Sequence, residues 1–221
     1  MKSISNSTLE FLTELKKNNN RDWFSANRSR YQKIKSDYES FIQSLIDEMI
    51  SFEPILKGLE AKSCTFRINR DIRFSNDKTL YKTNLGAFIV RGGRKNGDRF
   101  AGYYLHVEPG NKSMIAGGAY MPPAPWLKLI RGKIDEDGEK LLKIINNREF
   151  RTYFKKLEGE KLSGLPRGYS KDHPYLELLK HKSYIAVRMI SDREVIGRDF
   201  FNDVIRTFKA MKPLNDFLNV H

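Results

Sequence analysis

Residues 66–84 hold the densest group of chemically capable side chains in the sequence. Arg67, Asn69, Asp71 and Arg73 recur at every second position, which is strand spacing, so we expect them to share one face of a strand. Guanidinium groups bind phosphate or carboxylate through two parallel hydrogen bonds. The spacing therefore predicts a strand that presents an anion-binding surface, with Phe66, Ile68, Ile72 and Phe74 on its core side.

The same stretch supplies groups that can move protons. Asp71 and Asp77 can act as general bases, orient the arginines, or ligate a hard cation together with substrate oxygens. Tyr81 can orient a substrate, so we assign these three as catalytic candidates. The other candidates for contact with an anion are Arg70, Lys78, Lys82 and Asn84. An alternative stays open, in which Arg67, Asp71 and Asp77 pair with one another in an internal ion-pair network closed to solvent.

Two other segments contribute candidates. Arg21 lies at a predicted turn between two helices and can line the same cleft as the central strand. Tyr104 and His106 share one face of a later predicted strand, where His106 is the best general acid or base in the chain. Both segments have a structural alternative: the turn can be held by Asp22 as a helix cap, and a lone histidine can be a hydrogen-bonded structural residue.

Familiar signatures of metal and cofactor sites are absent from the sequence. The four histidines and one cysteine do not have zinc-ligand spacing, and we assign no metal site. The chain has no phosphate-binding loop, no dinucleotide fingerprint, no zinc-protease motif and no nucleophile elbow. No cofactor is indicated.

These side chains must be positioned by an α+β fold. Apolar periodicity predicts a helical hairpin in residues 1–60, with one helix from Ser7 and a long second helix from Asp22 to about Ser51. Alternation and short turns predict an antiparallel sheet in residues 62–121, with strands near 66–74, 85–91, 102–108 and 113–120. Residues 122–221 are predicted to be mainly helical, with a fifth strand at 183–190 and a last helix from Arg193 to Met211. The expected sheet thus has about four to five strands, flanked by the N-terminal hairpin and C-terminal helices. No repeat or long linker interrupts the chain, so we expect a single domain over residues 1–221.

The net charge of the chain indicates which classes of partner to expect. The net charge is +13, and residues 62–99 contain ten Lys or Arg against three Asp. Such a field attracts phosphorylated small molecules or nucleic acid, although a basic surface can also serve only solubility. Apolar runs are far shorter than the ~20 residues of a membrane span, so no membrane partner is expected. The polar N-terminus and the single cysteine, Cys64, favour a cytoplasmic protein.

The central stretch and several flanking motifs together resemble a family of bacteria and fungi that is known only as a domain of unknown function, number 2461. The resemblance spans nearly the whole chain and rests on Phe11-Leu12, Asn18-Asn19, Arg21–Phe24, residues 66–84, Tyr103–His106 with Glu108-Pro109, Gly117-Gly118 with Tyr120, and Pro166–Tyr169 with His173-Pro174. Leu80 departs from it where the family carries a proline, which changes loop stiffness. The resemblance implies one intact domain and brings no activity, cofactor or catalytic residue.

The leading hypothesis is a polar, basic cleft that binds an anionic, phosphate-bearing small molecule, and whether the protein is an enzyme stays open. Nucleic-acid binding is the first alternative, since the basic turn at residues 91–99 lies near Tyr103 and Tyr104. A structural or partner-binding protein with an internal Arg–Asp network is the second. The sequence does not indicate the oligomeric state.

Overall fold

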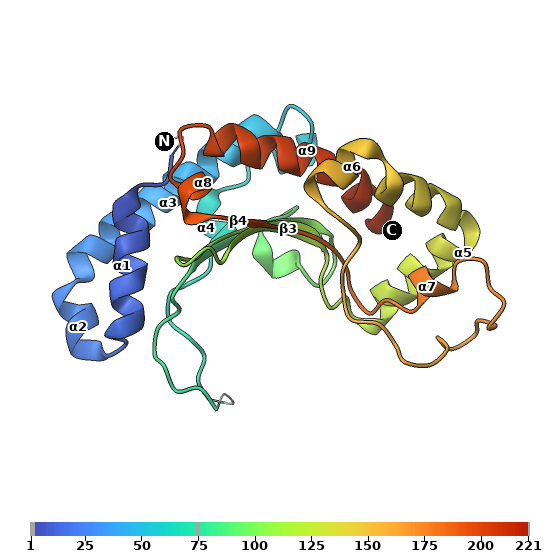
Figure 1. Ribbon diagram of the computed structural model, residues 1–221, viewed down its shortest axis with the longest axis horizontal. Coiled ribbons are helices and arrows are strands. Elements are labelled where there is room, and N and C mark those ends of the chain that lie inside the picture. The colour runs from blue at the N-terminus through green and yellow to red at the C-terminus, as the bar shows by residue number, and fades with distance from the viewer. Residues whose placement is uncertain (1–2, 74–75, 221) are drawn as a thin grey trace.

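The structure is a computed structural model that describes residues 3–73 and 76–220. Its centre is an antiparallel sheet in the order β1(Leu85–Ile89), β2(Gly102–Val107), β3(Ser113–Ala119) and β4(Tyr184–Ile190). Figure 1 shows the sheet as the middle of an arch, with the long helices α3(Arg28–Met49) and α9(Phe200–Leu218) above it. The expected α+β fold with four to five antiparallel strands is confirmed.

Alternation along the strands divides the sheet into two faces. One face carries buried side chains such as Ala87, Leu105 and Ile115, and it packs against α3 and α9. Phe41 of α3 stacks on Phe200 of α9, with ring centroids 5.7 Å apart. Gly117 permits close contact with α9, because a Cβ atom there would lie 2.2 Å from the Met211 sulfur. We call this the covered face.

The first predicted strand is the main error in the expected sheet. Residues 66–73 and 76–84 instead form an arm, which hangs away from the open side of the sheet (Figure 1). Its two halves pair with each other: Arg70 N donates to Leu80 O at 3.0 Å, and Lys82 N donates to Ile68 O at 2.8 Å. A bridge from Thr65 to Ala87 ties its base to β1. Backbone groups that bond within the arm are not free to pair with the sheet. The fourth strand is β4, which pairs with β3 at the opposite edge.

The predicted core side of that strand also needs correction. Ile68 is buried as expected, but Phe66 is 42% exposed. Phe74 lies outside the described residues.

The N-terminal hairpin is confirmed with different boundaries. It consists of α1(Asn6–Lys17), α2(Arg21–Ala26) and α3, so the predicted second helix is interrupted. Asn27 causes the break, because it ends α2 and precedes α3 with non-helical angles (φ −101°, ψ 12°). Asn20 rather than Asp22 caps α2, since its side chain accepts a hydrogen bond from Trp23 N at 2.9 Å. The helices are followed by η1(Pro54–Leu56) and α4(Ala61–Cys64).

After β3 the chain is mainly helical, apart from β4 and an irregular segment at residues 154–175. Its first helix, α5(Ala124–Asn146), is kinked at Asp137. It is followed by α6(Arg148–Tyr153), α7(Leu176–Leu179) and α8(Asp192–Val195). The last helix, α9, starts later than predicted and runs past Pro213, because Leu214, Phe217 and Leu218 are buried and their packing offsets the proline's missing hydrogen bond. Within residues 3–73 and 76–220, no helix combines the length and apolarity needed to cross a membrane.

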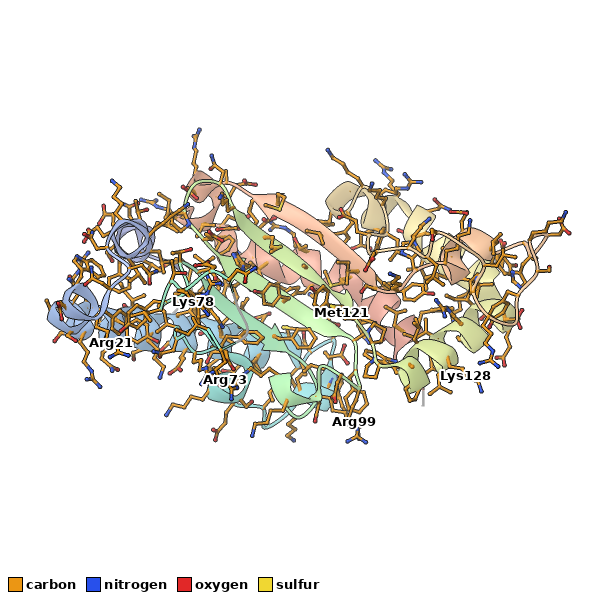
Figure 2. All side chains as sticks on the ribbon, turned by 90° about the horizontal axis from the view of Figure 1, so that it is seen from below. Arg21, Arg73, Lys78, Arg99, Met121 and Lys128 are labelled. Carbon is orange, nitrogen blue, oxygen red and sulfur yellow. The ribbon has the colours of Figure 1, made fainter. Side chains whose placement is uncertain are left out.

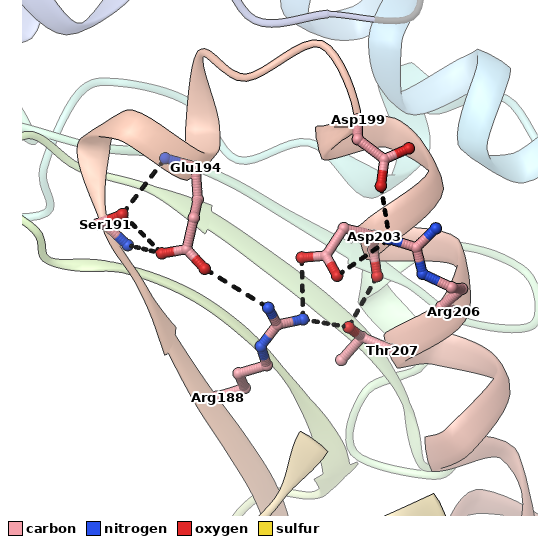
Figure 3. A network of polar contacts seen from close by, with 7 residues as sticks. All are labelled: Arg188, Ser191, Glu194, Asp199, Asp203, Arg206 and Thr207. Carbon is pink, nitrogen blue, oxygen red and sulfur yellow. Dashed lines mark hydrogen bonds and ion pairs between the residues drawn. The ribbon is translucent and has the colours of Figure 1, made fainter. Parts of the chain in front are cut away.

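A polar network joins β4 to the helices at the edge of the covered face (Figure 3). Arg188 Nη1 lies 2.9 Å from Asp203 Oδ2 and donates to Thr207 Oγ1 at 2.8 Å. Its other terminal nitrogen faces Glu194, which completes a capping box with Ser191 at the start of α8. The half-buried guanidinium thus has carboxylate and hydroxyl partners.

Candidate anion-binding site

The other face of the sheet, which we call the open face, lies opposite α3 and α9 (Figures 1 and 2). Pairing brings Gly86, His106 and Met114 into one row across β1, β2 and β3. A second row contains Phe88 and Tyr104. The short helix η2(Arg94–Asn96) follows β1, and its Arg94 reaches the ring of Phe66 at the base of the arm. The arm also lies on this side, so three segments meet there.

Cations surround the ring of Phe66 at the base of the arm. Lys82 Nζ lies 5.3 Å from the ring centroid, and the guanidinium carbon of Arg94 lies 5.8 Å from it. Arg67 is close enough for its charge to act on Lys82. We call Arg67, Lys82 and Arg94 the root cluster. Within the described chain none of the three takes part in a salt bridge, although the charge of Arg67 acts on Asp71.

The root cluster changes the proton affinity of its lysine. Burial lowers the pKa of Lys82 below its usual value, and the positive charges of Arg67, Arg94 and Arg70 lower the pKa further. The cations therefore repel one another in the free protein. An anion placed among them would relieve this repulsion.

A chain of hydrogen bonds, which we call the relay, lies beside the root cluster and joins Tyr104, His106 and Glu108 of the β2 segment with Asn84. His106 Nε2 lies 2.9 Å from Glu108 Oε2, so in the neutral ring this nitrogen carries the proton. His106 Nδ1 then accepts from the Tyr104 hydroxyl at 3.0 Å and from the Asn84 amide at 3.3 Å. Phe66 contacts Tyr104 edge to face at 6.3 Å, which links the relay to the cluster.

Burial and close packing determine the protonation state and the position of the Tyr104 hydroxyl in the relay. Burial, followed by the charge of Glu108, raises the pKa of Tyr104 to about 12, so its hydroxyl is protonated at neutral pH. Gly86 makes room for this hydroxyl, because a Cβ atom there would lie only 3.0 Å from the oxygen. The side chain of His106 is largely buried, and Thr83 donates to Glu108 Oε1 at 3.4 Å. Tyr104 and His106 share one strand face as predicted, and Asn84 joins them through its hydrogen bond to His106.

The acidic candidates lie farther out on the arm, where they pair with its own arginines. Asp71 accepts from Arg73 Nε at 2.9 Å and from Arg73 Nη2 at 2.6 Å. Arg73 hydrogen bonds hold the pKa of the Asp71 carboxyl at about 2. Asp77 pairs with Arg70 and accepts hydrogen bonds from Thr79, which lower its pKa.

These pairs differ from the predicted internal network. They are exposed, and Arg67 does not form a salt bridge with either aspartate within the described residues. Lys78 donates to Ile72 O at 3.2 Å, while Asn69 contributes its backbone to a bridge with Tyr81. The distal arm thus satisfies its own charges.

Two other predicted site residues lie apart from the relay. Tyr81 is buried and stacks on Phe24, with ring centroids 4.0 Å apart and planes 12° from parallel. Asn19 fixes its backbone: Asn19 Oδ1 accepts from Leu80 N and Tyr81 N, and Asn19 Nδ2 donates to Tyr81 O. Arg21 is exposed at the start of α2. Tyr81 and Asn19 therefore anchor the arm to the hairpin.

Arg94 is the member of the cluster that the sequence analysis missed, because its segment resembled an ordinary basic turn. Its place depends on tertiary packing: Arg94 Nη1 donates to Ser63 O at 3.2 Å. Gly93 has φ 87°, and a Cβ atom there would lie 2.8 Å from Ser63 Oγ. The Gly92-Gly93 pair was the only available signal, since glycine permits such a conformation and close approach.

Two hollows of the described surface lie apart from the site. A cavity of about 270 Å³ lies beside η1 and the C-terminal part of α9, and a groove of about 550 Å³ lies between α1 and the β2–β3 turn. Neither is lined by residues of the root cluster or the relay. In residues 3–73 and 76–220, no three His, Cys, Asp or Glu side chains are grouped as metal ligands.

The fold and site define an α+β protein whose basic arm overhangs the open face of a four-stranded antiparallel sheet. The chain belongs to the family described as conserved hypothetical protein DUF2461, whose model matches residues 7–217. No curated protein and no solved structure matches the chain.

Proposed function

We propose that the protein binds a phosphate-bearing small molecule at the root cluster. The observation that carries this proposal is that Lys82 and Arg94 both lie over the Phe66 ring, with Arg67 close enough for its charge to act on Lys82, and that none of the three forms a salt bridge among the described residues. Two guanidinium groups and an ammonium group more than neutralise the charge of a phosphate dianion and supply hydrogen-bond donors for its oxygens. The paired arginines of the distal arm, Arg70 and Arg73, lack this spare capacity.

The relay supplies acid–base chemistry next to the proposed anion. His106 and Tyr104 are the groups best placed to give a proton to a substrate oxygen or to take one, with Glu108 orienting the imidazole. An enzymatic role would use this relay rather than Asp71 or Asp77, whose carboxylates bind neighbouring donors. The lone cysteine, Cys64, is buried and free, and we place the protein in the cytoplasm, where phosphorylated metabolites are abundant.

Calorimetric titration with inorganic phosphate and methyl phosphate tests the proposal. Lys82→Met keeps a chain of similar length without its charge, and we expect it to weaken binding by about tenfold or more, as for a charge-assisted hydrogen bond. Lys128→Met makes the same change on α5, outside the root cluster, and should leave affinity unchanged (Figure 2). Equal affinity in the wild type and both variants, with thermal unfolding showing all three folded, would refute the proposal.

Single-stranded nucleic acid is a second candidate, because a cation cluster beside Tyr104 on a sheet face suits phosphates and stacked bases. The two candidates differ in salt dependence. Three phosphate contacts give a slope of about −2 for log affinity against log salt with a single strand. Oligonucleotide binding with that slope, together with no measurable binding of methyl phosphate, would favour nucleic acid.

A further inference from the structure

We infer that the ligand of the root cluster is an amphiphile, a phosphate ester of an aliphatic chain, whose chain lies across the open face onto β3 and β4. This ligand class rests on the proposed function, because the root cluster must first hold the phosphate. The inference comes from the uneven chemistry of the open face. Its β1–β2 half is polar and cationic, while its β3–β4 half is apolar.

The apolar half follows from the strand register. Met114 pairs with Met189, Ala116 with Val187, and Gly118 with Ile185, so these side chains share the open face. They adjoin the polar half directly, since His106 pairs with Met114 and Tyr104 with Ala116. Met189 is 58% exposed, and Val187 and Ile185 are partly exposed. Ala116 and Gly118 are buried between these side chains, while Met114 is partly exposed. Apolar side chains that are exposed together on one sheet face are typical of a binding surface.

The end of β3 extends this surface. Tyr120 and Met121 are 67% and 68% exposed, and Figure 2, which looks at the open face, shows Met121 near the end of the sheet toward α5. Met121 has φ 45°, in the left-handed region that a residue with a side chain rarely adopts. Its N–H donates to Ser183 Oγ at 2.9 Å, which holds the strained backbone in place. Strain retained beside exposed apolar groups points to a functional contact.

The width of the sheet fits the length of one aliphatic chain. Phe66 N bonds to Gly86 O of β1, so the cluster lies at the β1 edge, and Met189 lies on β4 at the other edge. Three strand spacings separate these edges, about 14 Å, which an alkyl or isoprenyl chain of about ten carbons spans. A phosphate held at the root cluster would therefore place such a chain over Met114 and Val187.

The side chains favour an aliphatic chain over nucleobases. Bases bind by stacking on exposed aromatic rings, but the paired part of β3 and β4 offers methionine, valine and isoleucine, and the exposed ring of Tyr120 lies beyond the end of β3. Methionine is flexible and polarisable, so it adapts to chains of different shape. The aromatic Phe88 of the open face contacts the turn after η2, since a Cβ atom on Gly97 would lie 2.9 Å from its ring.

Affinity as a function of chain length tests the inference. We expect dissociation constants to fall from methyl through butyl and octyl to decyl phosphate in the wild type. Each fully buried methylene contributes about 0.8 kcal/mol, or up to about fourfold in affinity. The titrations use ester concentrations below micelle formation, with sedimentation to record the oligomeric state.

Two variants separate the chain from the phosphate. Met189→Ser, at an exposed position that should tolerate the change, is expected to reduce the gain with chain length and leave methyl phosphate affinity unchanged. Lys82→Met should weaken all esters by the same factor. Ile196→Ser alters an exposed apolar residue on the segment after α8 and serves as the matched control for Met189.

The outcomes are distinguishable. Affinity that is flat with chain length, while methyl phosphate still binds at Lys82, overturns the amphiphile and leaves the proposed function standing. No binding of methyl phosphate or inorganic phosphate overturns the proposed function itself. Binding to anionic phosphatidylserine vesicles without affinity for soluble octyl phosphate, or chain-independent dimerisation blocked by Met189→Ser, would also overturn the inference.

Discussion

The two faces of the sheet are built from alternate residues of the same strands, yet they differ in how completely their groups are partnered. On the covered face, apolar side chains pack against α3 and α9, and Arg188 is held by Asp203 and Thr207. On the open face, the root cluster lacks salt bridges among the described residues, and Met189 is exposed. Packing and ion pairs are therefore concentrated on one side of the sheet, whereas the other side leaves charged and apolar side chains such as Arg67 and Met189 exposed.

The largest expected contrast between the faces is in the stability that is lost when an apolar side chain is truncated. Phe208 is fully buried on α9, with its ring 5.1 Å from Tyr103. We expect Phe208→Ala to lower the free energy of unfolding by about 3–5 kcal/mol, because it removes buried area and leaves a cavity. Val187→Ala on the open face should lower it by less than about 1 kcal/mol. Urea denaturation of both variants measures the difference, and equal losses would contradict the division into two faces.

A buried histidine on the covered side should make stability depend on pH. His181 packs against Tyr184, and burial, followed by the charge of Lys161, lowers its pKa to about 4. Because the folded pKa lies below the unfolded value of about 6.5, the unfolded chain binds the proton first as pH falls. Stability contributed by neutral His181 is present above pH 6.5 and is lost between about pH 6.5 and 4.

We expect that loss to reach about 3 kcal/mol, which corresponds to the shift between the two pKa values. Urea unfolding at several pH values in the wild type and in His181→Gln measures it. The variant should be less stable at neutral pH and have a flatter profile in this window. Nuclear magnetic resonance should show His181 titrating near pH 4 with or without methyl phosphate, since it lies away from the root cluster. A midpoint near 6.5 would contradict the expected effect of burial.

Loss of an ion pair on the covered face should also lower stability more than loss of an exposed ion pair on the arm. Asp203 is 20% exposed and contacts both Arg188 and Arg206. Asp203→Asn should lower the free energy of unfolding by about 2 kcal/mol, because it leaves a half-buried guanidinium short of a charged partner. Asp71→Asn at the exposed end of the arm should leave it nearly unchanged, because solvent screens the exposed pair. Thermal and urea unfolding compare the two, and a larger effect at Asp71 would show that the arm contributes to the stability of the fold.

The sequence predicts the parts of this arrangement that depend on local periodicity. The alternation at Tyr104 and His106 indicates their shared face, and the apolar pattern at residues 183–190 indicates β4. It fails at residues 66–73, because a period of two shows an extended chain but does not show which segment pairs with it. Arg94 could not be predicted as part of the site, since its position depends on contact with Ser63, about thirty residues away in the chain.

The smallest expected effect is the change in the free energy of unfolding when Lys82 is replaced. The sign of this change tests whether Lys82 serves anion binding or the stability of the fold. Without ligand, Lys82→Met should raise the free energy of unfolding at pH 7 by about 0.5 kcal/mol, because it removes repulsion within the root cluster. The folded pKa of Lys82 lies below its unfolded value, so the unfolded chain holds this proton more tightly. The advantage of the variant should therefore shrink as the pH rises toward 10.5 and Lys82 loses its charge.

Methyl phosphate should reverse this order. A ligand at one hundred times its dissociation constant stabilises the folded wild type by about 2.7 kcal/mol, whereas a variant that binds about tenfold more weakly gains only about 1.4 kcal/mol. Wild type should then be more stable than Lys82→Met. Sodium chloride at the same ionic strength is the control, since it screens the repulsion without occupying the site and should only reduce the difference between the proteins. A reversal in both salts would mean that screening, rather than a bound anion, acts on the root cluster.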